Sequence, residues 1–170
     1  LVMAMIAAIT WFFTTVQSIE YFNKLNGRNR NRYYMFMLWT LGATMAIFLS
    51  ANLYTTFIFF EVMTFTSYVL VIHGESEKAI DASKSYLGFG VLGGLVTLMG
   101  LFMLQANIGT LEMDQILSAI QSSGTSYGMV LASGLLILFG FGVKAGMYPL
   151  HTWLPKAYVA APEPATALLS

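Results

Sequence analysis

Five apolar runs, each long enough to cross a lipid bilayer as a helix, dominate this sequence of 170 residues. A membrane-spanning helix needs about 20 mainly apolar residues. The runs cover residues 1–19, 33–50, 53–72, 87–104 and 127–148, and a sixth begins near residue 165. Only 9% of the residues are charged, against about 25% in soluble domains. The sequence therefore predicts an all-α fold, a polytopic transmembrane helix bundle.

The charge balance and the residue types exclude several functions. Eight Lys and Arg residues match eight Asp and Glu residues, and no long basic run is present to bind nucleic acid. The sequence has no cysteine, which excludes a disulfide framework, an iron–sulfur cluster and a thiolate zinc site. We expect no cofactor and no metal on this chain, so that any redox chemistry would belong to partner subunits.

The two ends of the sequence suggest a larger protein. The first residue is Leu1, and residues 167–170 stop within an apolar run. We expect a single transmembrane domain that is a fragment of a longer polypeptide.

Basic residues in the connectors predict the orientation of the bundle. If the spans alternate in direction, one side receives seven basic residues and the other side receives none. The seven are Lys24, Arg28, Arg30, Arg32, Lys78, Lys84 and Lys156. Because connectors rich in Lys and Arg stay in the cytoplasm, we expect the loop from Lys24 to Arg32 to be cytoplasmic.

Glu61 is the first candidate for chemistry. It is the ninth residue of its run, about 12 Å along the helix axis, and charges at such depth are costly and usually functional. Thr64 and Tyr68 at i+3 and i+7, with Tyr54 at i−7, would form a polar stripe that faces protein or water. The alternative is a neutral glutamic acid that is hydrogen-bonded in a structural role.

Lys144 is the second candidate. Gly140, Gly142 and Gly146 weaken the surrounding helix, and Pro149 removes a backbone donor. We predict a broken helix near Lys144, which a membrane tolerates only where the break lines protein or a wet cavity. The alternative is a lysine that reaches the membrane surface, since the apolar run ends four residues later.

Glu61 and Lys144 would control a proton best if they acted as a pair. At 4 Å and an effective dielectric constant of 20, their attraction is about 4 kcal/mol. Movement of Glu61 toward or away from Lys144 would therefore load or release a proton.

Two further residues are candidates for members of a proton path. Lys84 follows Asp81 near the start of its run and is either the cytoplasmic mouth of the path or an interfacial anchor. His151 lies just beyond Pro149 and beside Trp153. Since histidine is the side chain that changes charge near neutral pH, it is either a relay or a residue of the interface.

Glycine patterns in two runs, at residues 88–93 and 140–144, look like nucleotide-binding motifs but lie inside predicted membrane helices. Gly88, Gly90 and Gly93 spell GxGxxG without a preceding strand. Gly90 and Gly94 instead form a pair of small residues that lets membrane helices pack closely.

Four segments carry a resemblance to a known family: FFEVMTFTSY (59–68), ASKSY (82–86), GVKAGMYPLHTWLP (142–155) and APEPATALLS (161–170). Together they resemble the antiporter-like subunits of the respiratory complex I superfamily. These comprise the large membrane subunits of NADH:quinone oxidoreductase, the Mrp-type cation/proton antiporters and the arms of membrane-bound hydrogenases. The resemblance spans the third to the start of the eighth helix of about fourteen.

The resemblance implies roles for the candidate residues. Glu61 matches the glutamate of the family's fifth helix, and Lys144 matches the lysine of its broken seventh helix. His151 matches the histidine of the family's His-Thr-Trp-Leu-Pro string, and Lys84 matches a lysine near the start of the sixth helix. The sequence departs from the family at Lys156, where aspartate is usual, and at Glu163, where small or hydroxyl residues are common.

The resemblance also implies partners and a location. We expect other membrane subunits of a multisubunit complex, with protons or Na⁺ as the transported ion, in the inner membrane of a bacterial or archaeal cell. The leading interpretation is a proton-translocating subunit of an NADH:quinone oxidoreductase-like complex that is not itself catalytic. A multisubunit Na⁺/H⁺ antiporter, a membrane-bound hydrogenase, a purely structural membrane anchor and a quinone-binding redox subunit are the alternatives.

Overall fold

The structure is a computed structural model that describes residues 1–24 and 29–170. Its helices are α1 (Val2–Lys24), α2 (Arg30–Leu49), α3 (Leu53–Val71), α4 (Glu77–Ile108), α5 (Ile116–Ser122), α6 (Tyr127–Lys144), α7 (Trp153–Ala160) and α8 (Glu163–Leu169). Two 3₁₀ helices, η1 (Ile72–Gly74) and η2 (Leu150–Thr152), join them. Throughout the described part of the chain the regular elements are helices, which confirms the all-α prediction.

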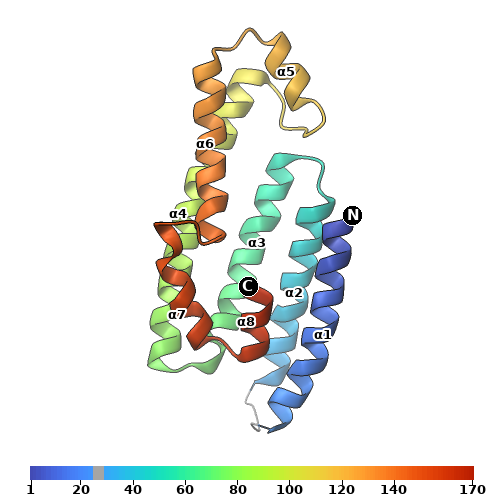
Figure 1. Ribbon diagram of the computed structural model, residues 1–170, viewed down its shortest axis with the longest axis vertical. Coiled ribbons are helices and arrows are strands. Elements are labelled where there is room, and N and C mark those ends of the chain that lie inside the picture. The colour runs from blue at the N-terminus through green and yellow to red at the C-terminus, as the bar shows by residue number, and fades with distance from the viewer. Residues whose placement is uncertain (25–28) are drawn as a thin grey trace.

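Four described segments are long and apolar enough to cross a membrane. They are Val2–Lys24, Leu53–Gly74, Glu77–Ile108 and Tyr127–Lys144, which confirms the class of a membrane helix bundle. Helix α2 is not among the four, because Arg30, Arg32 and several tyrosine and threonine side chains lower its hydropathy. It nevertheless packs between α1 and α3 (Figure 1), and the assignment of residues 33–50 as a span stays a prediction.

Helix α4 organises one side of the bundle. It begins ten residues before the apolar run 87–104, because the Ser76 hydroxyl accepts a hydrogen bond from the Ala79 N–H at 3.1 Å and caps the helix. Helix α6 packs on the later half of α4, and α7 packs on its first half (Figure 1). Helices α1, α2 and α3 stand side by side on the other flank.

The described basic connector residues gather at one end of the bundle. The Arg32 guanidinium lies 2.6 Å from the Glu75 carboxylate and donates a hydrogen bond to the His73 carbonyl at 3.2 Å, which ties the start of α2 to the α3–α4 connector. Lys78 and Lys156 line one cavity of about 640 Å³ between α4 and α7. Arg28 lies outside the described residues, and the cytoplasmic orientation of this end stays a prediction.

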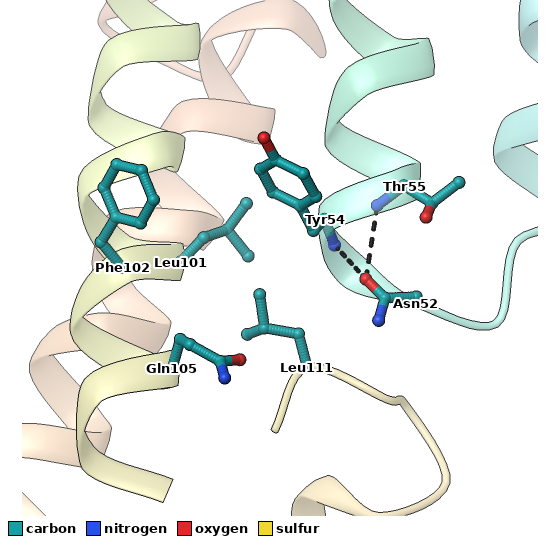
Figure 2. A pocket seen from close by; sticks show the side chains of 7 residues that line it. All are labelled: Asn52, Tyr54, Thr55, Leu101, Phe102, Gln105 and Leu111. Atoms are coloured by element: carbon teal, nitrogen blue, oxygen red, sulfur yellow. Dashed lines mark hydrogen bonds between the residues drawn. The ribbon is translucent and has the colours of Figure 1, made fainter. Parts of the chain in front are cut away.

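At the opposite end, Asn52 joins the start of α3 to the α4–α5 connector, and Figure 2 shows its bonds to α3. Its side-chain oxygen caps α3 by accepting hydrogen bonds from the Tyr54 and Thr55 N–H groups at 2.8 and 3.4 Å. Its amide nitrogen donates to the Glu112 carboxylate at 2.7 Å. Backbone bonds on either side, such as Leu53 N–H to the Leu111 carbonyl at 2.9 Å, hold the α4–α5 connector against the start of α3.

We expect Asn52→Ala to destabilise the protein by about 1–2 kcal/mol, because it removes a helix cap and the hydrogen bond to Glu112. Thermal unfolding of the detergent-solubilised full-length protein measures this change. Asn52→Ser is the matched control, since serine keeps the cap but not the bond to Glu112, and it should recover about half of the loss. Equal melting of Asn52→Ala and the wild type would contradict the prediction.

Candidate proton-transfer site

The end of α6 places Lys144 halfway along α4. Gly146 adopts φ +73°, and its N–H donates to the Val143 carbonyl at 3.2 Å. The Met147 N–H donates to the Gly142 carbonyl at 2.9 Å, so these two bonds close the helix with a Schellman motif. Lys144 is therefore the last residue of α6, where the negative end of the helix dipole favours a positive charge.

Helix α6 thus ends four residues before the predicted apolar run does, because Gly146 turns the chain. The Trp153 indole N–H donates to the Val143 carbonyl at 2.9 Å and ties the start of α7 to the end of α6. The broken helix near Lys144 stays a prediction.

The Lys144 ammonium group binds Tyr86 of α4. Its nitrogen donates a hydrogen bond to the Tyr86 hydroxyl and lies 4.0 Å from the centre of the ring, a cation–π arrangement. The same hydroxyl lies 2.5 Å from the Ser67 hydroxyl of α3, which in turn donates to the Met63 carbonyl at 2.5 Å. Because Ser67 donates to Met63, Tyr86 is left to donate to Ser67 while its oxygen accepts from Lys144.

Glu61 lies against the same helix two turns away. A Cβ atom built on Gly94 would fall 2.5 Å from Oε1 and 3.1 Å from Oε2 of Glu61, so the carboxylate occupies the space that a side chain on Gly94 would fill. Oε1 is buried and has no hydrogen-bond partner. Among the ion pairs of the described residues, none joins Glu61 to Lys144, although the two charges lie close enough to interact electrostatically.

The contact between α3 and α4 is a ladder with three rungs. Ser67 meets Tyr86, Thr64 meets Gly90, and Glu61 meets Gly94. The ladder uses every third residue of α3 and every fourth residue of α4, which is ridge-into-groove packing of two antiparallel helices. Gly90 and Gly94 therefore allow close helix packing, as the sequence predicts, and Gly94 gives the Glu61 carboxylate its place.

A cavity of about 190 Å³ opens beside Lys144. Its polar lining consists of Thr40, Thr44, Ser67, Tyr86 and Lys144. This volume is large enough to hold water molecules. The cavity thus extends the polar surroundings of Lys144 from α3 and α4 to α2.

Lys84 and His151 lie apart from this cluster. The Lys84 side chain is exposed and lies 3.5 Å from the exposed Asp81 carboxylate. His151 is exposed in η2, and its ring stacks on Tyr148 with 5.6 Å between the ring centres. Tyr54 is also exposed, so the polar stripe of α3 does not extend to it, whereas Thr64 is buried against α4.

Sequence reasoning missed Tyr86 and Ser67 as members of the site. Both occur within the segments that resemble the family, but neither is ionised at neutral pH, so charge at membrane depth did not single them out. A usable signal was the spacing of Tyr86, Gly90 and Gly94, which puts a tyrosine and two small residues on one helical face.

The fold and this cluster define a polytopic membrane protein with ionisable groups inside its helix bundle. The sequence pattern of the family described as "NADH:quinone oxidoreductase/Mrp antiporter, TM" matches residues 50–170. The chain belongs to this family, and the resemblance seen in the sequence is confirmed.

Individual relatives and a solved structure agree with this assignment. A Na(+)/H(+) antiporter subunit of Bacillus subtilis (strain 168) is 33% identical over 141 residues, which are 83% of this chain and 28% of that protein. Hydrogenase-4 component B of Escherichia coli (strain K12) is 29% identical over 168 residues, which are 99% of this chain and 24% of that protein. The chain spans about a quarter of the length of these curated relatives.

The solved structure comes from the membrane-bound sulfane sulfur reductase, an archaeal respiratory membrane complex. One of its chains matches with a TM-score of 0.73 and 30% sequence identity, over 79% of this chain and 27% of that chain.

Proposed function

We propose that this chain is part of a proton-translocating membrane subunit of a respiratory NADH:quinone oxidoreductase-like complex, and that protons move through Glu61 and Lys144. One observation carries the proposal. A lysine at the end of α6 and a glutamate with a buried, unpartnered oxygen both face the same two turns of α4. Unpaired charge inside a membrane bundle is costly and is typical of ion pathways.

The proposal assigns the remaining residues and partners as follows. Lys84, at the basic end of α4, is the cytoplasmic entrance of the path, and His151, just beyond α6, is a relay. Other membrane subunits complete the path and supply the driving force. The chain itself is not catalytic and carries no cofactor. In a bacterial or archaeal inner membrane, the loop from Lys24 to Arg32 faces the cytoplasm.

A second candidate function is supported by the first relative described above, which is named a Na(+)/H(+) antiporter subunit. Mild solubilisation of the full-length protein from its native membrane, followed by mass spectrometry of the proteins that copurify, separates the candidates. Flavin or iron–sulfur subunits would support a redox-driven pump, and nickel subunits would support a hydrogenase. Small membrane subunits alone would support a secondary cation/proton antiporter and contradict the redox-driven proposal.

Glu61→Gln tests the path itself. Glutamine keeps the size of the side chain beside Gly94 but does not exchange a proton, so we expect proton uptake by inverted membrane vesicles to fall at least about tenfold, which corresponds to about 1.4 kcal/mol in the barrier. Assembly, measured by the amount of intact complex in the membrane, should be unchanged.

Glu20→Gln is the matched control, because Glu20 is exposed and pairs with Lys24 on its own helix. The double variant Glu61→Gln with Lys144→Met tests the structural-anchor alternative. Transport at the wild-type rate by the assembled double variant would support a static packing pair and overturn the proposed path.

A further inference from the structure

We propose that Tyr86 is a positioning residue that holds the Lys144 ammonium group in a resting position and competes for it with the Glu61 carboxylate. This inference rests on the proposed function, because it describes how the same lysine is held between two partners.

The geometry gives the Lys144 ammonium group two possible partners, Tyr86 and Glu61. Val143, the neighbour of Lys144, contacts α4 at Gly93, where its Cβ would lie 3.1 Å from a Cβ atom on that glycine. Because α6 runs antiparallel to α4, the backbone of Lys144 lies between the level of Gly94, against which Glu61 lies, and the level of Tyr86. The lysine side chain extends from this level toward Tyr86, which lies earlier along α4. Because a lysine side chain is a flexible four-carbon stem, rotation about its bonds carries the ammonium group from one partner toward the other.

Tyr86 and Glu61 differ in whether their oxygen atoms already have hydrogen-bond partners. The hydroxyl of Tyr86 already has its hydrogen-bond partners, since it accepts from Lys144 and is hydrogen-bonded to Ser67. Its ring packs edge-on against Trp153 with 5.2 Å between the ring centres. Glu61 has a buried oxygen that accepts no hydrogen bond, and leaving such a charged acceptor without a partner is unfavourable. The arrangement thus has one occupied and one vacant position for the same ammonium group.

Few ionisable side chains face Lys144 and could compete for its ammonium group. The ionisable side chains that face it are Glu61 from α3 and Tyr86 from α4, with Tyr158 of α7 near Tyr86. From α1 and α2 the cavity beside it is lined by uncharged side chains among the described residues, namely Trp11, Thr40 and Thr44.

Tyr86→Phe is the direct test, because it removes the hydroxyl and keeps the ring. A hydrogen bond to a charged group contributes about 1.5–3 kcal/mol. Its loss should therefore change the ratio of the Glu61-bound to the Tyr86-bound position of Lys144 by about 10- to 100-fold in favour of Glu61. In the full-length protein in vesicles, solid-state NMR of ¹³C-glutamate and ¹⁵N-lysine measures this as a carboxylate–ammonium coupling that grows in Tyr86→Phe. The coupling is assigned by its loss in Tyr86→Phe combined with Glu61→Gln. Proton uptake should fall about tenfold, since Lys144 is then retained by Glu61.

Tyr33→Phe is the matched control. Tyr33 is fully buried, and its hydroxyl has no partner among the described residues, so its loss should alter neither the coupling nor the uptake. If Tyr86→Phe fails to assemble, Ser67→Ala provides the second variant. It removes the group that holds the Tyr86 hydroxyl and should shift the coupling in the same sense by a smaller factor.

The proposal is overturned if the coupling in Tyr86→Phe, or in Ser67→Ala where Tyr86→Phe does not assemble, equals that of the wild type. It is also overturned if Tyr86→Phe lowers uptake by the same factor with and without Glu61→Gln, because a purely structural residue acts independently of the carboxylate. Failure of the proposed function looks different, since Glu61→Gln and Lys144→Ala would then both transport at the wild-type rate whatever the coupling shows.

Discussion

Lys144→Ala in the intact assembly should abolish proton transport, while the complex still assembles. Lys144 supplies the positive charge of the site, and without it a proton crossing this region has no basic side chain to receive it. A proton that has to pass as an unpaired charge at the centre of the membrane meets an added barrier of about 3 kcal/mol. This barrier corresponds to roughly a 100-fold loss of rate. Proton uptake by inverted vesicles, driven by the substrate that energises the wild type, measures the effect.

The control for Lys144→Ala is Lys24→Ala. The Lys24 side chain is exposed and lies 2.6 Å from the Glu20 carboxylate on the same helix, where an ion pair contributes little. Uptake by the Lys24→Ala vesicles should equal that of the wild type. Normal uptake by Lys144→Ala vesicles would contradict the role assigned to this lysine.

Gly140→Ala should be the most damaging of the conservative substitutions in the bundle. A Cβ atom on Gly140 would overlap the Thr97 side chain and lie 2.5 Å from the Gly93 carbonyl oxygen and 2.9 Å from the Thr97 backbone nitrogen. Because two of these atoms belong to the α4 backbone, the helices must separate. We expect a loss of about 3 kcal/mol, the upper end of overpacking costs, measured by thermal unfolding in detergent.

Gly134→Ala provides a control in the same helix. No atom lies within 4 Å of a Cβ atom built there, and alanine favours a helix over glycine by up to about 1 kcal/mol. The two substitutions should therefore change the melting temperature in opposite directions. A Gly140→Ala protein that melts with or above the wild type would show that α4 and α6 are not packed as described.

The sequence allowed the class of fold and the family to be predicted, because both depend on local patterns. Apolar runs of spanning length indicate membrane helices wherever they occur, and the segment from Gly142 to Pro155 carries the family resemblance. The extent of the helices was harder to predict. Residues 77–86 are polar enough to end a hydropathy run, yet they continue α4 because Ser76 caps it.

The site was only partly predictable, for a different physical reason. Glu61 and Lys144 stand out as charges in apolar runs, but their roles and those of Lys84 and His151 stay predictions. The alignment of Ser67 with Tyr86 and of Glu61 with Gly94 depends on how α3 and α4 are packed against each other. Composition and periodicity define the faces of each helix but not this alignment.

The position where α6 ends has an electrical consequence. Lys144 follows Val143, which is opposite Gly93, close to the midpoint of α4 (Glu77–Ile108). In the proposed path, a proton that reached Lys144 from either side would have crossed about half of the membrane potential, or about 1.2 kcal/mol for each 100 mV. Under the proposed function, protonation and deprotonation of this lysine would be two electrogenic steps of similar size, so the membrane voltage would act on both.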